Sequence, residues 1–131
     1  YCAQIAIAAQ NSLSLTHKPS MHMSDWQDLI NKLRQFNEER DWAQFHNAKD
    51  LALALSIEAA ELNELFLWKK AEEADPQKVK EELADVFAFA LQLADKYNLD
   101  VNQIVSDKID RNAEKYPVDK SKGSAKKYNE L

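Results

Sequence analysis

Residues 50–68, DLALALSIEAAELNELFLW, carry the pattern that decides the fold of this chain. Several leucines in this segment recur at intervals of three, four or seven positions, which is the spacing of one face of an α-helix. Glu58 and Glu61 stand three positions apart in the same segment, so their carboxylates project to one side of the helix, about a turn from each other. The segment predicts an amphipathic helix that carries a pair of acids.

Residues 81–94, EELADVFAFALQLA, repeat this arrangement, because Glu82 and Asp85 are again three positions apart. Two such pairs facing each other would form an oxygen-rich site for a hard divalent cation such as Mg²⁺. A magnesium site in a small helical protein indicates phosphate chemistry.

The alternative is that these acids are surface residues, since acids three positions apart are common on solvated helix faces. By spacing alone, this alternative is favoured. The sequence around Asp85 weakens it, because Asp85 interrupts the apolar run LADVFAFALQLA and is therefore predicted to lie beside the core. A carboxylate drawn toward an apolar interior costs several kcal/mol unless something compensates its charge. A bound cation would compensate it.

The composition bounds the protein class. The chain has 131 residues, which is enough for one domain with a real core, and its 45% hydrophobic and 30% charged residues are ordinary for a globular protein without a membrane span. A net charge of −5 argues weakly against nucleic acid as a partner. The single Cys2 excludes an intramolecular disulfide and a cysteine-based zinc site, which fits a cytoplasmic protein.

Residues 1–22 differ from the rest, with Lys18 as their one charged side chain. They lack the basic leading region of a secretion signal. We interpret them as a leader that need not be native, before a natural start at Met21 or Met23; an extra helix is the alternative. Residues 23–131 are then predicted to form a single domain.

Four helices are predicted after this leader. Ser24 can cap the first, residues 39–50 form a connection, and Asp50 is the expected cap of the second. Asp75 followed by Pro76 is a strong start signal for the third helix, up to about residue 97, and the fourth spans about 101–115. The predicted inward side chains are Trp26, Leu29, Ile30, Leu33, Phe36, Leu51, Leu55, Leu62, Leu65, Phe66, Val79, Leu83, Val86, Phe87, Ala90, Leu91, Val101, Ile104, Val105 and Ile109.

These helices predict an all-α protein, either an antiparallel four-helix bundle or a pair of helical hairpins. The chain has one Gly and three Pro, which favours long helices over β-hairpins. The tail after Pro117 is predicted to be a loop or an ordered flap. Three Trp and five Phe exceed what four short helices can bury, so exposed apolar surface is expected to meet a partner chain.

The E-x-x-E, spacer, E-x-x-D arrangement resembles the signature of the all-α nucleoside triphosphate pyrophosphohydrolases of the MazG type. Within that superfamily, the chain is most similar to the dCTP pyrophosphatase group. The segments ERDWAQFH, LALALSIEAAELNELFLWK, EELADV and KIDRNAEKYPVDKSKGSAKKY resemble that group's stretches in the same order. The resemblance spans roughly residues 25–128.

The resemblance implies Mg²⁺-dependent hydrolysis of a nucleotide between its α and β phosphates, which releases a monophosphate and pyrophosphate. Glu58, Glu61, Glu82 and Asp85 match the metal ligands, and Glu61 is our choice for the residue that takes the proton from water. For Glu64, a supporting ligand and a surface acid are equally favoured. The resemblance also implies a four-helix fold assembled as a homo-oligomer, with a tetramer favoured and a dimer as the alternative.

The resemblance further implies a set of substrate contacts. Those to the base or sugar are Trp42, His46, Trp68 and Phe89, and those to the triphosphate are Lys108, Asn112, Lys115, Tyr116, Ser124 and Lys127. Flat rings suit a nucleobase, but core packing is an equal alternative for Trp68 and Phe89 and is favoured for Phe36 and Phe45. For His46, a hydrogen-bonded structural role is favoured over a contact to the ligand. Phe89 lacks a hydroxyl group, which leaves base discrimination open.

Two functions therefore compete. The first is a house-cleaning enzyme that removes dCTP or modified dCTP from the nucleotide pool, with a different or broad dNTP preference as a variant. The second is a non-catalytic helical bundle that keeps a structural cation. The base preference, the number of Mg²⁺ ions and the identity of the general base are left open by the sequence.

Overall fold

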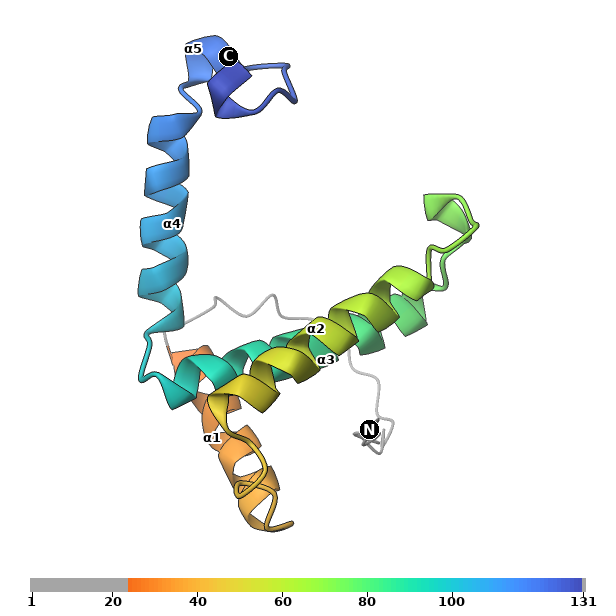
Figure 1. The fold of residues 1–131 in the computed structure, drawn as a ribbon, viewed down its shortest axis with the longest axis vertical. Helices are drawn as coiled ribbons and strands as arrows, with labels where there is room; N and C mark the ends of the chain where they lie inside the picture. The colour runs from red at the N-terminus through yellow and green to blue at the C-terminus, as the bar shows by residue number, and fades with distance from the viewer. Residues whose placement is uncertain (1–23, 131) are drawn as a thin grey trace, which may run out of the picture.

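The computed structural model describes residues 24–130, and the leader predicted at 1–22 lies outside them. The described part contains no strand, which confirms the predicted all-α class. Its elements are α1 (Ser24–Glu38), α2 (Ala48–Glu64), the 3-10 turn η1 (Ala71–Glu73), α3 (Pro76–Lys96), α4 (Val101–Lys115), α5 (Val118–Ser121) and the 3-10 turn η2 (Tyr128–Glu130) (Figure 1).

Side-chain caps explain where the central helices begin. The Asp75 carboxylate accepts a hydrogen bond from the Gln77 amide (2.9 Å), with Pro at the first helical position as predicted. The predicted cap of α2, Asp50, is wrong: Asn47 has the extended backbone of a cap, and its side-chain oxygen accepts from the Asp50 amide (3.0 Å). Asp50 instead lies in the first turn, where its charge favours the helix N-terminus.

Two helices flank α3. α2 packs along it, and α1 packs across it near its C-terminal end (Figure 1). Leu51 of α2 and Leu91 of α3 are among the few buried apolar side chains of the described residues, and Leu51 is fully buried. Polar contacts join α1 to α3, because Arg34 forms a two-pronged ion pair with Asp95 and Asn37 donates to Gln92 (2.6 Å).

The fourth helix departs from the predicted bundle. α4 begins after Asn98, whose left-handed backbone (φ 51°) ends α3, and it then runs away from the α2–α3 pair (Figure 1). Ile109, predicted to face inward, is 61% exposed. The helical period identifies an apolar face but not what covers it, and within this chain the described residues leave that face open. Other predicted inward residues that are exposed are Leu29, Phe66, Leu83, Phe87, Ile104 and Val105.

The connection between α1 and α2 is only partly folded inward. Trp42 packs edge-on against Phe36, with ring centroids 5.8 Å apart. Phe45, for which core packing was predicted, is 62% exposed, so that prediction is wrong for this chain. Phe45 lies in a short connection in which Trp42 and His46 are half-buried. The same connection exposes the Phe45 ring to solvent.

We expect Asp75→Ala to lower the free energy of unfolding by about 1 kcal/mol, because the Gln77 amide loses its acceptor at the start of α3. Urea unfolding followed by circular dichroism measures the change. Asp75→Asn is the matched control, since its side-chain oxygen can still accept, and it should lose much less. Equal losses in the two variants would contradict the capping role.

Candidate metal and nucleotide site

Three carboxylates meet where α2 lies along α3. Glu58 and Glu61 project from α2, and Glu82 projects from α3; each offers an oxygen, and these oxygens all lie within 4.8 Å of one another. The meeting follows from the sequence, because each helix turns its acids to the same side at a spacing of three. We call Glu58, Glu61, Glu82 and the adjoining Asp85 the acid cluster.

Asp85 belongs to the cluster electrostatically. Partial burial raises the pKa of Asp85, and the negative charges of Glu61 and Glu81 raise it further. Burial also raises the pKa of Glu58, with further contributions from Glu61, Asp85 and Glu82. Three of the four predicted acids therefore meet within one chain, and Asp85 lies within electrostatic reach of Glu58 and Glu61.

The charge of the cluster makes it a fit for a hard cation. The pKa of Glu82 is raised by burial first and then by neighbouring acids, including Glu61 and Asp85. A raised carboxylate pKa means that the ionised form is destabilised. A divalent cation would reverse this effect, and a donor set made only of carboxylate oxygens suits Mg²⁺ or Ca²⁺ better than a soft metal.

Glu64 lies at the edge of this cluster. Its charge is the last of the contributions that raise the pKa of Glu82, and its side chain is exposed at the end of α2. Glu64 is therefore within electrostatic reach of the cluster without being enclosed by it.

Two of the predicted base contacts meet beside α3. The His46 ring lies edge-on to Phe89, with centroids 6.5 Å apart and an interplanar angle of 73°. Phe89 is one helical turn beyond Asp85. Trp68, by contrast, follows the end of α2 in a left-handed conformation (φ 60°) and is 94% exposed. Core packing of Trp68 is therefore wrong for this chain.

A hollow of about 190 Å³ lies between α1, α3 and the connection that carries His46, and we call it the α1–α3 pocket. Gln92 on its wall is seven positions after Asp85, so the two residues share a face of α3 and are separated by about 10 Å along the axis. Asn37 and Gln92 line this pocket and were not predicted as site residues. A signal existed for Gln92, which interrupts the same apolar run as Asp85.

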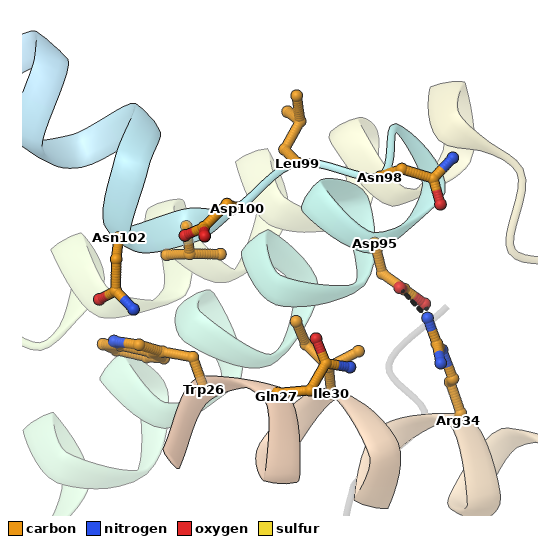
Figure 2. A pocket seen from close by; sticks show the side chains of 10 residues that line it. Trp26, Gln27, Ile30, Arg34, Asp95, Asn98, Leu99, Asp100 and Asn102 are labelled. Carbon is orange, nitrogen blue, oxygen red and sulfur yellow. Dashed lines mark hydrogen bonds and ion pairs between the residues drawn. The ribbon is translucent and has the colours of Figure 1, made fainter. Parts of the chain in front are cut away.

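A second hollow, of about 320 Å³, lies where α1 meets the end of α3 and the start of α4. In Figure 2, Trp26 and Arg34 form its α1 side, and Asp100 and Asn102 approach from α4. None of the acid-cluster residues lines it. It is therefore separate from the predicted chemistry.

The predicted triphosphate contacts do not meet the acid cluster within this chain. They lie on α4 or beyond it, and Figure 1 shows α4 leading away from the α2–α3 pair. The segment after α4 folds back on its end: Tyr128 lies edge-on to Tyr116 (6.1 Å), and the Lys115 ammonium lies 5.4 Å from the Tyr128 ring centroid. The residues concerned are Lys108, Asn112, Lys115, Tyr116, Ser124 and Lys127.

Comparison with known proteins yields consistent matches. The MazG-like family matches residues 53–131. Rat (Rattus norvegicus) dCTP pyrophosphatase 1 is 38% identical over 132 residues, covering 95% of this chain and 75% of its own length. Human dCTP pyrophosphatase 1 is 36% identical with the same coverage. The crystal structure of a pyrophosphatase from Archaeoglobus fulgidus, 34% identical, superposes with a TM-score of 0.66 and covers 79% of this chain and 99% of its own.

The raised pKa values predict a pH-dependent stability for the metal-free protein. A carboxylate whose pKa is raised in the folded state stabilises that state below its unfolded pKa, and this stability is lost as the pH rises through the folded pKa. We therefore expect Glu58→Gln to raise the melting temperature at pH 7 by about 2 °C, and by less at pH 4, where protonation of Glu58 in the wild type relieves the repulsion.

The measurement is thermal unfolding in EDTA at both pH values. Glu114→Gln on α4 is the matched control, because that exposed acid lies outside the cluster. A melting temperature that Glu58→Gln leaves unchanged or lowers at pH 7 would contradict the repulsion inferred here.

Proposed function

Because this chain belongs to the MazG-like family, we propose that it hydrolyses a deoxynucleoside triphosphate, with dCTP or a modified dCTP favoured, to the monophosphate and pyrophosphate. The enzyme class, a nucleoside triphosphate pyrophosphohydrolase, is supported by the dCTP pyrophosphatases and by the pyrophosphatase structure that it resembles. The role would be house-cleaning of the nucleotide pool in the cytoplasm.

The observation that carries this proposal is the acid cluster. Glu58, Glu61, Glu82 and Asp85 would hold Mg²⁺, and the bound metal would supply positive charge against the triphosphate and activate water. Glu61 is the proposed general base, because it lies among the ligands and its charge acts on the other acids of the cluster. The metal held by the remaining acids would keep the α-phosphate beside it.

The base end of the nucleotide would lie further along α3. His46 and Phe89 are one turn or more beyond Asp85, and the α1–α3 pocket follows. The axial distance of about 10 Å from Asp85 to Gln92 suits a nucleotide with its α-phosphate at the acids and its base toward the pocket. Trp42 completes the proposed base contacts within this chain. Trp68 follows the end of α2 opposite to His46 and is exposed, so in this proposal it would contact the base bound by a neighbouring chain.

The triphosphate contacts on α4 require a second chain in this proposal. Lys108, Asn112 and Lys115 lie on a helix that leaves its own α2–α3 pair, and the same helix exposes an apolar face that includes Val105 and Ile109. Exposed apolar faces of this kind mark association surfaces. We therefore propose a homo-oligomer, a tetramer or else a dimer, in which α4 reaches a neighbouring acid cluster. In the described part of the chain, no helix is both long and apolar enough to cross a membrane.

The proposed activity is tested with Mg²⁺ and a panel of dCTP, dUTP, dTTP, dATP, dGTP and CTP, with pyrophosphate release as the readout. We expect Glu61→Gln and Asp85→Asn to reduce kcat by at least about 100-fold, because each removes a ligand or base from the cluster. Glu114→Gln should retain wild-type turnover. No cleavage by the wild type even at high enzyme concentration would favour a bundle with a structural cation, and equal rates on all bases would favour broad specificity.

The proposed assembly is tested with Ile109→Asp, which places a charge on the exposed face of α4. We expect light scattering to show an oligomer for the wild type at micromolar concentration and a smaller species for the variant, with turnover reduced at least about tenfold. Asp110→Asn, a change at the adjacent exposed position, is the control and should keep the wild-type mass. A monomeric wild type with full activity would contradict the assembly.

A further inference from the structure

Asn37 lies near the end of α1 and forms hydrogen bonds in two directions. Its side-chain Nδ2 donates to Gln92 Oε1 on α3 (2.6 Å). Its main-chain carbonyl oxygen accepts from the amide of Trp42 (2.9 Å) and from that of Arg40 (3.3 Å). The side chain therefore joins α1 to α3, while the main chain joins α1 to the connection that follows it.

The acceptor on α3 has a fixed orientation. Gln92 Nε2 donates to the Ala88 carbonyl one turn earlier (3.3 Å), so the nitrogen of the carboxamide faces its own helix and the oxygen faces Asn37. Both Asn37 and Gln92 are half-buried, and a hydrogen bond is stronger where water is partly excluded. Arg34 also joins the two helices through Asp95, but it lies three positions before Asn37 and half of its side chain is exposed. The Asn37–Gln92 bond is therefore the closer of these two contacts to the point where the chain leaves α1.

The connection after α1 begins with a strained turn. Asp41 has a left-handed backbone (φ 54°), which is unfavourable for residues other than glycine, although aspartate tolerates it better than most. Such a conformation persists where surrounding contacts fix it. The bond from the Trp42 amide to the Asn37 carbonyl closes this turn directly after Asp41, and the Trp42 ring packs edge-on against Phe36. The path of the connection therefore depends on where Asn37 lies.

The same connection supplies part of the wall of the α1–α3 pocket. Ala43 and His46 line the pocket from the connection, Asn37 lines it from α1, and Gln92 lines it from α3. Trp42, which is a proposed base contact, directly precedes Ala43. Movement of the end of α1 away from α3 would displace Trp42 and this part of the wall together.

We propose that Asn37 is a positioning residue for the base end of the nucleotide: its side chain holds the end of α1 against Gln92, and its carbonyl oxygen holds the Trp42 amide. This inference rests on the proposed function and adds to it a residue outside the set implied by family resemblance. Asn37 is not part of the acid cluster, so its loss should weaken binding of the nucleotide and leave the chemical step intact.

The test is a double-mutant cycle in steady-state kinetics on dCTP. Asn37→Leu and Gln92→Met approximately keep the shape of each side chain and remove its hydrogen bonds. Each single variant should raise KM about fivefold, the factor for one hydrogen bond, with kcat within about twofold. The double variant should raise KM no further than either single variant, because all three proteins lack the same bond. Independent effects would instead multiply to about 25-fold, and that result would overturn the inference.

Asn31→Leu is the matched control. It removes the bond from Gln27 Nε2 to Asn31 Oδ1 (3.2 Å), which also joins two carboxamides but lies within α1 alone. The control should change neither KM nor kcat. A rise in KM equal to that of Asn37→Leu would overturn the positioning role, because disturbance of α1 anywhere along its length would then suffice.

Hydrogen exchange of the Trp42 amide is a second readout that requires no turnover. This amide should exchange at least about tenfold faster in Asn37→Leu and in Gln92→Met, and at the wild-type rate in Asn31→Leu. Gln92→Met leaves α1 unaltered and covers the case that Asn37→Leu folds poorly. An unchanged KM or an unchanged exchange rate in a folded Gln92→Met protein would overturn this inference alone. A wild type that cleaves no nucleotide overturns the proposed function and the role of Asn37 with it.

Discussion

Repulsion between carboxylates on the α2–α3 interface is the constraint on which the rest of this structure depends. Leu51 and Leu91 are buried on the same two helices that carry Glu58, Glu61 and Glu82. One carboxylate oxygen of each acid lies within 4.8 Å of the other two. Apolar packing therefore stabilises this pair of helices while charge repulsion destabilises it. The raised pKa values of Glu58 and Asp85 show that their ionised forms are destabilised. A purely structural interface would avoid this arrangement, since neutral side chains of similar size would pack at no electrostatic cost. Bound cations would neutralise this charge and make the arrangement favourable.

Helix α3 links the metal end of the proposed site to the base end. Asp85, Phe89 and Gln92 follow one another at intervals of four and three positions, so one face of the helix presents a carboxylate, a ring and a carboxamide in order. Asp85 lies within electrostatic reach of Glu61 on α2, and Gln92 contacts α1 through Asn37. A nucleotide has the same order of chemistry, charged at one end and flat and polar at the other. The rigidity of a helix of 21 residues would fix the distance between the two ends.

Local features of the structure were predictable from the sequence, whereas contacts between elements were predictable only in part. The Asp75–Pro76 start of α3 and the span of α4 follow from capping rules that act within one turn, and both are confirmed. The meeting of Glu58, Glu61 and Glu82 also followed, because two neighbouring helices with the same spacing leave few alternatives. The exposure of Ile109 and the tether from Asn37 to Gln92 did not follow, since they depend on which helices pack together and at what angle. A glutamine within an apolar run was a readable signal, but its partner, 55 positions away, was not.

The open position of α4 gives the proposed assembly a functional meaning. A helix that carries Lys108 and Lys115 beyond its own acid cluster contributes nothing to charge balance there, because the Debye length is only about 8 Å at physiological salt. The same helix exposes Val105 and Ile109, whose burial against another chain would bring those lysines along with it. Acids that bind metal and cations that bind phosphate would then come from different chains. The site would be complete only in the oligomer, so that a lone subunit could bind metal and yet hold a triphosphate weakly.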